Sequence, residues 1–191
     1  LAALEAHGTL ENTLIIFTSD HGDALGDHGL PFKGYFYESM AHVPMIVRGP
    51  HAPDGQRRAT AGGRCASVVS GLDVVATFFD VCGVQAPKTV QGKSLTPLLE
   101  DPMASTHDVV FCEITGRVMV TDGQWKYCHY VTGEAELYDL TVEAPQMEVE
   151  NLAGRPEVAQ VESRLRARLL EHWLQNQHTQ QMATSVPQHP F

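Results

Sequence analysis

The sequence predicts an α/β fold: an incomplete, mainly parallel sheet flanked by helices, followed by a small antiparallel sheet with a C-terminal helix. The first part is predicted because short continuous apolar runs, typical of strands buried on both faces, alternate with helical patterns. The second is predicted because short β-rich runs separated by turn pairs follow residue 103. We therefore expect an α/β part at 1–103, an antiparallel subdomain with its helix at 104–176, and a frayed tail at 177–191.

The α/β part divides into segments by its apolar runs and its glycines. In chain order we expect a helix at 1–7, a buried strand at 14–17, a polar loop at 18–31 and a second buried strand at 43–47. An exposed loop at 51–63 and two helices, at 72–81 and 94–99, follow. Gly8 and Gly83 follow two of the helical patterns, where glycine commonly ends a helix. The two buried strands should lie side by side or near each other in the parallel sheet.

The antiparallel part is predicted from four β-rich runs, at 108–114, 117–121, 125–130 and 135–140. Asp122-Gly123 between two of them is the strongest hairpin signal in the chain. A helix at 157–175 follows, with apolar residues at spacings of three or four: Val158, Val161, Leu165, Leu169 and Trp173. We expect this helix to pack on the sheet through Leu165, Leu169 and Trp173.

Composition disfavours two classes of partner. The 191 residues include 13 Lys and Arg against 23 Asp and Glu, so the net charge is −10 and no basic face for nucleic acid is expected. No apolar run approaches the roughly 18 residues that a membrane-spanning helix needs, so no membrane contact is expected either. The sequence predicts a soluble protein of the cytoplasm or the periplasm, with the compartment left open.

The chain ends and the cysteines add two expectations. The chain starts at Leu1, without Met, in what reads as a helix already under way, so we expect it to be a piece of a longer protein. The four cysteines are far apart and form no C-x-x-C pair, which argues against a zinc knuckle. Buried free thiols are expected, with a disulfide as the alternative.

The loop after the first apolar run carries the strongest functional signal. Residues 18–29 contain three Asp, two His and three Gly, just beyond a strand end where α/β sheets place ligands. Asp20 and His21 can offer an oxygen and a nitrogen to one divalent cation, and Gly22 permits the sharp turn that this needs. Two residues cannot complete a coordination shell, so further ligands must come from elsewhere. The alternative is an ordinary loop, because Asp and Gly are common turn residues.

A set of motifs in this order resembles the C-terminal half of the sulfatase family, within the alkaline phosphatase superfamily. The first motifs are Thr18-Ser19-Asp20-His21-Gly22, Leu25-Gly26-Asp27-His28-Gly29, Lys33-Gly34, Tyr37-Glu38 and Val43-Pro44-Met45-Ile46. The later ones are Gln91-Gly92-Lys93-Ser94-Leu95, Trp125-Lys126-Tyr127, Glu136-Leu137-Tyr138-Asp139-Leu140 and Asn151-Leu152-Ala153. The resemblance spans residues 4–173, and it rests more on the order and spacing of the motifs than on any one of them.

The resemblance implies a hydrolase of sulfate esters that acts on a small sulfated substrate, with residues 1–103 in its catalytic domain. It implies that Asp20 and His21 are metal ligands and that Lys33 is a catalytic contact to the sulfate. It implies Ca²⁺ as the metal, while the histidine leaves Mn²⁺ or Zn²⁺ as alternatives. His28 would bind substrate or the leaving group, or would instead cap a glycine turn.

The chain departs from the family pattern at the nucleophile. The family uses a formylglycine made from Cys or Ser in a C/S-x-P-x-R segment, and none of the four cysteines and no serine lies in such a segment. The family's N-terminal acidic ligands are missing too. The formylglycine is therefore expected outside this chain, and the chain alone is expected to be inactive.

Three functions remain open at this point. The first is a sulfatase, and the second is a phosphonate monoester or phosphodiester hydrolase of the same superfamily. The third is a non-catalytic module that binds a partner through the small sheet and its acidic surface. A homo-oligomer is one expected state, because an incomplete sheet leaves unpaired strand edges.

Overall fold

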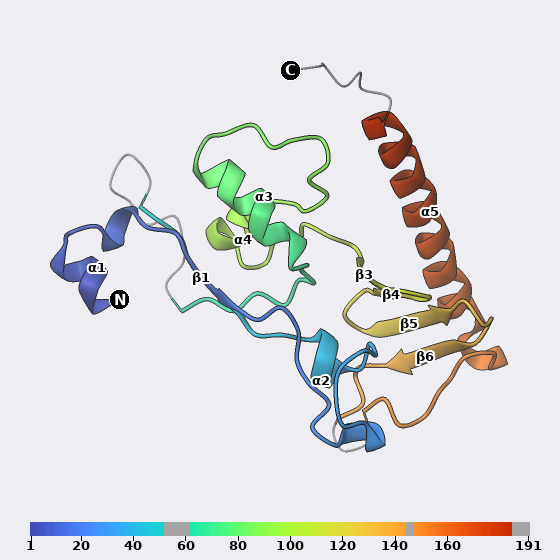
Figure 1. Ribbon diagram of the computed structural model, residues 1–191. Helices are drawn as coiled ribbons and strands as arrows, with labels where there is room; N and C mark the ends of the chain where they lie inside the picture. Colours follow the sequence, from blue (N-terminus) through green and yellow to red (C-terminus); the bar gives the residue numbers. More distant parts are fainter. Residues whose placement is uncertain (52–61, 144–146, 185–191) are drawn as a thin grey trace. The chain divides into compact units, whose positions relative to one another are not determined.

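The computed structural model describes residues 1–51, 62–143 and 147–184, with side chains as far as residue 176 (Figure 1). The chain divides into two units, Leu1–Asp108 and Val109–Phe191, each described here by itself. The sequence-based division at 103–104 lies a few residues earlier. Among the described helices, none is both long and apolar enough to cross a membrane.

The first unit contains short elements joined by long loops. In chain order they are α1 (Ala2–Ala6), η1 (Leu10–Asn12), β1 (Ile15–Thr18), η2 (Asp27–Gly29), α2 (Glu38–Ala41), β2 (Met45–Arg48), α3 (Leu72–Val81) and α4 (Thr96–Glu100). Most of the segments expected from the sequence are present, but the exposed loop at 51–63 lies largely outside the described residues.

The two strands of the first unit are neighbours, as expected, but they run antiparallel. Residues Ile15 to Thr18 pair with Arg48 to Met45, so the expectation of a mainly parallel sheet is wrong for this pair. The reason is that a continuous apolar run reports burial, whereas strand direction depends on how the connecting chain returns. Phe17 and Ile46 are paired directly opposite each other and are 62% and 65% exposed.

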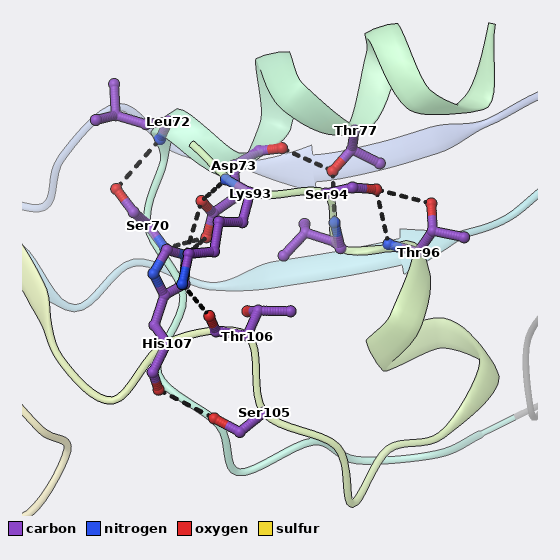
Figure 2. Close-up of polar contacts among 11 residues, drawn as sticks. Ser70, Leu72, Asp73, Thr77, Lys93, Ser94, Thr96, Ser105, Thr106 and His107 are labelled. Carbon is purple, nitrogen blue, oxygen red and sulfur yellow. Dashed lines mark hydrogen bonds and ion pairs between the residues drawn. The ribbon is translucent and has the colours of Figure 1, made fainter. Parts of the chain in front are cut away.

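A buried carboxylate joins α3 to the segment that follows it (Figure 2). Asp73 is fully buried and accepts hydrogen bonds from the backbone N–H groups of Ser70 and Lys93, each at 2.8 Å. His107 Nε2 lies 3.0 Å from both Asp73 carboxylate oxygens. A Cβ atom at Gly92 would lie 2.1 Å from the Leu72 carbonyl oxygen. The Gly92-Lys93 motif is therefore explained by close approach to α3 and by pairing with Asp73.

The second unit contains the predicted antiparallel sheet. Its strands are β3 (Val110–Ile114), β4 (Arg117–Thr121), β5 (Trp125–Tyr130) and β6 (Ala135–Asp139), and they are hydrogen-bonded in that order. The expected hairpin turn joins β4 and β5, where Asp122 Oδ1 accepts from the backbone N–H groups of Gln124 and Trp125. Burial raises the pKa of Asp122, but these two donors and the Arg164 guanidinium together lower it by more than burial raises it. The pKa of Asp122 therefore lies below its usual value.

A long helix, α5 (Ala159–Thr184), follows η3 (Pro156–Val158) and packs on this sheet (Figure 1). Leu165 is fully buried in a core with Val109, Val120, Tyr127 and Leu137, and Leu169 packs at its edge. The helix continues to Thr184, eight residues into the stretch predicted as a frayed tail, and residues 185–191 lie outside the described part.

Trp173 is the one predicted stripe residue that lies away from the sheet, with 56% of its surface exposed. An α-helix has about 3.6 residues per turn, so each four-residue step rotates a position by about 40°. Trp173 lies two such steps after Leu165, so it is rotated away from the face that Leu165 buries. His172 lies seven residues after Leu165, close to two full turns, so it is on the same face as Leu165. His172 stacks on the Phe111 ring at 3.9 Å and its Nε2 lies 3.1 Å from Glu113 Oε1.

The four cysteines are free thiols. Cys128 is buried and Cys112 is half-buried, but Cys65 and Cys82 are exposed. The expectation of buried thiols is therefore correct only in the second unit, where both cysteines belong to sheet strands.

Candidate functional site

The loop after β1 approaches α2 so closely that one position must be glycine. The Gly22 backbone N–H donates to the Met40 carbonyl oxygen at 2.8 Å. A Cβ atom at Gly22 would lie 2.0 Å from the Ser39 carbonyl oxygen. Gly22 is not among the residues with positive φ, so the sequence-based reason, a sharp turn, is replaced by close approach. The main chain of Asp20 and His21 is thereby held against α2.

Asp20 presents a charged and accessible carboxylate. Its side chain is 82% exposed, and its Oδ1 accepts the His21 backbone N–H at 2.9 Å and the Ser19 hydroxyl at 3.3 Å. The donated His21 N–H lowers the pKa of Asp20 below its usual value. Asp20 is therefore ionised at neutral pH, with Oδ2 left to face His21.

The backbone selects the tautomer of His21. Nδ1 lies 2.7 Å from the Gly22 carbonyl oxygen, which can only accept, so Nδ1 carries a proton. In the neutral ring, Nε2 then presents its lone pair. That nitrogen lies 3.2 Å from Asp20 Oδ2, so two electron-rich atoms converge on one point. Such a pair is stabilised by a proton on Nε2 or by a cation beside it.

The cation present in the structure is the side chain of Lys33. Its Nζ lies 2.5 Å from His21 Nε2, and the ammonium donates to the imidazole lone pair. The structure thus brings together three residues predicted from the sequence, namely Asp20, His21 and Lys33. A carboxylate oxygen and an imidazole nitrogen also fit a divalent metal ion. Within the described part of the chain, however, no group of three or more His, Cys, Asp or Glu side chains gathers around one point.

His28 lies in a tight turn of the same loop and is held by an aromatic ring instead of by the other three residues. The turn is closed by a hydrogen bond from the Gly26 N–H to the Leu30 carbonyl oxygen at 2.9 Å. The His28 ring stacks on Tyr37, with centroids 3.7 Å apart and planes 7° from parallel. Of the two roles left open for His28, capping of the turn is not seen, because backbone groups close the turn and its helical segment has no side-chain cap.

Sequence reasoning missed two features of this site. The first is the contact of Gly22 with α2, and the second is the stack of His28 on Tyr37. Tyr37 is part of one of the motifs quoted above, but nothing in the spacing of residues 28 and 37 indicates that their rings meet. For the first feature the sequence does hold a signal, because a glycine beside a candidate ligand is compatible with close approach of another segment as well as with a sharp turn.

Comparisons with known proteins identify the family of this chain. The family described as "N-sulphoglucosamine sulphohydrolase, C-terminal" matches residues 26–175. Arylsulfatase K of Xenopus laevis is 33% identical over 186 residues, which cover 87% of this chain and 33% of the relative. Choline-sulfatase of Rhizobium meliloti (strain 1021) is 34% identical over 155 residues, or 77% of this chain and 28% of the relative. The chain therefore spans about a third of the length of the curated relatives it matches.

Solved structures give the same result. A protein in complex with its substrate D-glucosamine-2-N,6-O-disulfate has a TM-score of 0.72 and 29% identity, over 93% of this chain and 37% of that one. The phosphonate monoester hydrolase of Agrobacterium radiobacter has a TM-score of 0.72 and 28% identity, over 91% of this chain and 37% of that one. With the family match over residues 26–175, these likenesses show that the chain belongs to the sulfatase family, in its C-terminal portion.

Proposed function

We propose that this chain is the C-terminal portion of a sulfuric ester hydrolase, in which Asp20 and His21 bind a divalent cation and Lys33 binds the sulfate group. The observation that carries the proposal is that His21 Nε2 lies 3.2 Å from Asp20 Oδ2 and 2.5 Å from Lys33 Nζ. Family membership supports the same assignment, because the likenesses include proteins named as sulfatases.

The ligand pair would hold one side of the cation. Calcium is the expected ion, since it prefers oxygen ligands, and the imidazole leaves Mn²⁺ or Zn²⁺ as alternatives. Asp20 is ionised and His21 presents the correct nitrogen without a change of tautomer. The remaining ligands, and the formylglycine nucleophile, are expected outside these 191 residues. When bound, the cation supplies polarisation of the sulfate oxygens.

Lys33 would change partner when substrate and cation are present. Its ammonium donates to the lone pair of His21 Nε2, 2.5 Å away. A metal ion bound to His21 would use that lone pair instead. A charged ammonium then donates to the anionic oxygens of the sulfate, where charge develops during the reaction. His28 would contact the substrate or the leaving-group oxygen through its ring nitrogens.

A phosphonate monoester hydrolase is the second candidate. The likeness to the Agrobacterium radiobacter enzyme, at 28% identity and a TM-score of 0.72, favours it specifically. Sulfate and phosphonate esters both present tetrahedral anionic oxygens, so Lys33 and a cation would serve either substrate. In the whole protein we also expect β1 and β2 to belong to a larger, mainly parallel sheet that covers Phe17 and Ile46.

The proposal is tested by calcium binding and hydrolysis, measured on this chain and on the whole protein that contains it. We expect the isolated chain to bind calcium weakly or not at all in calorimetric titration and to hydrolyse no chromogenic sulfate ester, because it supplies only two ligands. The whole protein should bind calcium and hydrolyse the ester. Asp20→Asn should weaken calcium binding there, whereas Asp27→Asn, in the same loop, should not.

Two results would contradict the proposal. Micromolar calcium affinity or turnover by the isolated chain would mean that the site is complete within it. A whole protein that hydrolyses a phosphonate monoester and no sulfate ester would favour the second candidate.

A further inference from the structure

The ring of His28, in the loop after β1, stacks on the ring of Tyr37. The ring centroids are 3.7 Å apart and the planes differ by 7°. The histidine is exposed and lies in η2, whereas the tyrosine is half-buried and lies immediately before α2. One ring therefore belongs to an exposed turn and the other to the base of the site.

The turn that carries His28 has an unusual backbone. His28 has φ 52° and ψ 20°, in the left-handed region that non-glycine residues rarely adopt. Leu25, Gly26 and Gly29 in the same turn also have positive φ. This conformation costs free energy at each non-glycine position, so it persists only where the surroundings hold it. The stack on Tyr37 supplies such a contact from outside the turn.

Tyr37 is itself well anchored. Its carbonyl oxygen accepts the N–H groups of Met40 and Ala41 at 2.8 and 2.9 Å, at the start of α2. The neighbouring Phe36 and Met40 are 2% and 3% exposed. The Met40 carbonyl oxygen also accepts the Gly22 N–H beside the ligand pair. One short helix thus supports both the ligand pair and, through Tyr37, the ring of His28.

A stacked ring orients an imidazole without using its hydrogen-bonding atoms. The contact is made by the face of His28, so Nδ1 and Nε2 remain at the ring edge. Within the described residues neither nitrogen has a hydrogen bond or an ion pair with the protein. A group that must exchange protons or hydrogen bonds with a substrate needs both properties, a fixed direction and an uncommitted edge.

We infer that Tyr37 is a positioning residue, which acts through the ring face of His28 to direct the imidazole edge at the substrate. The inference rests on the substrate-binding role of His28 in the proposed function. It adds a residue that acts on His28 through the face of its ring.

Nuclear magnetic resonance of this chain tests the contact separately from activity. In the wild type, the His28 ring protons should be shifted upfield by the Tyr37 ring current. Tyr37→Phe should keep this shift and Tyr37→Leu should abolish it, while Phe32→Leu, which removes a 72% exposed ring from the same loop, should leave it unchanged. Absence of the shift in the wild type would overturn the inference.

A double-mutant cycle on the whole protein tests the role. Aromatic stacks of this kind are worth a roughly 2- to 10-fold effect, so Tyr37→Leu should lower kcat/KM by about that factor and Tyr37→Phe should restore it. In a His28→Ala background, Tyr37→Leu should cause no further loss. An equal loss in both backgrounds, or a loss in Tyr37→Phe as large as that in Tyr37→Leu, would overturn the inference.

The two experiments fail in distinguishable ways. If the whole protein hydrolyses neither sulfate nor phosphonate esters, the proposed function fails while the ring-current shift still reports the stack. If hydrolysis is present but the cycle is additive, the proposed function stands and the role of Tyr37 does not.

Discussion

Lys33 is a cation held by a neutral acceptor. Its Nζ contacts the His21 lone pair at 2.5 Å, and the same ring nitrogen lies 3.2 Å from Asp20 Oδ2. A hydrogen bond from ammonium to a neutral ring is replaced at small cost by one to an anionic oxygen, because hydrogen bonds between two charged groups are stronger. In the absence of substrate, the hydrogen bond to His21 therefore keeps the Lys33 ammonium near the proposed position of the substrate anion.

This arrangement predicts the kinetics of a Lys33 variant. In the whole protein, Lys33→Ala should lower kcat by about 10²- to 10³-fold, because one donor to the developing charge is lost. Steady-state kinetics with a sulfate ester measures this, and Lys88→Ala, an exposed lysine outside the site, should behave as wild type. A raised KM with unchanged kcat would instead mean that Lys33 binds the ground state and the transition state equally.

Gly22 makes a second prediction at this scale. Gly22→Ala should destabilise the first unit by about 1–3 kcal/mol, because the added Cβ forces the loop away from Ser39. Gly71→Ala is the matched control: nothing lies within 4 Å of its added Cβ and its φ is −56°. Thermal unfolding followed by circular dichroism distinguishes the two. Equal midpoints would show that the loop moves aside freely.

The sequence could predict which side chains form the site better than what holds them. In the structure His21 Nε2 contacts both Asp20 and Lys33, two of the residues that the motifs single out with it, while the roles of all three stay predictions. The tautomer of His21 and the stack of His28 on Tyr37 depend on atoms brought together by folding, and no periodicity in the sequence encodes them. The sequence also cannot show that only two ligands gather in the described chain.

Helix α5 illustrates how a periodic pattern should be interpreted. Leu165→Ala should cost about 2–5 kcal/mol of unfolding free energy, since the side chain is fully buried among sheet residues. Trp173→Ala should cost about 0.5 kcal/mol or less, because that side chain is 56% exposed. Urea unfolding measures both. If the tryptophan variant lost as much as the leucine variant, the predicted stripe would be right and the helix packed differently.

Strand direction shows the limit of the same kind of reasoning. The antiparallel sheet of the second unit was predictable, because turn pairs such as Asp122-Gly123 specify a hairpin and a hairpin specifies direction. Strands β1 and β2 are separated by a long loop without such a signal, so their apolar runs predicted neighbours correctly and direction incorrectly.

At the scale of the whole chain, the sheet of the first unit has open edges and exposed apolar side chains. Within the described residues, β1 and β2 each pair with one strand only, and they expose Phe17 and Ile46. We expect the isolated chain to self-associate with rising concentration. Ile46→Ser should weaken the association constant about 10-fold, the effect of losing one apolar contact. Sedimentation velocity measures it, and Val131→Ser, also exposed, should leave it unchanged; no concentration dependence in the wild type would contradict the expectation.

The cysteines of the two units differ in their expected reactivity. Cys65 and Cys82 are exposed in the first unit, whereas burial raises the pKa of Cys112 and of Cys128 in the second. A thiol that stays protonated reacts slowly with alkylating reagents. An alkylating label should therefore mark the first unit at once, and it should mark Cys128 only when the second sheet opens. The rate at which Cys128 is labelled therefore measures how often the second unit opens, while labelling of the first unit shows that the reagent is active from the start.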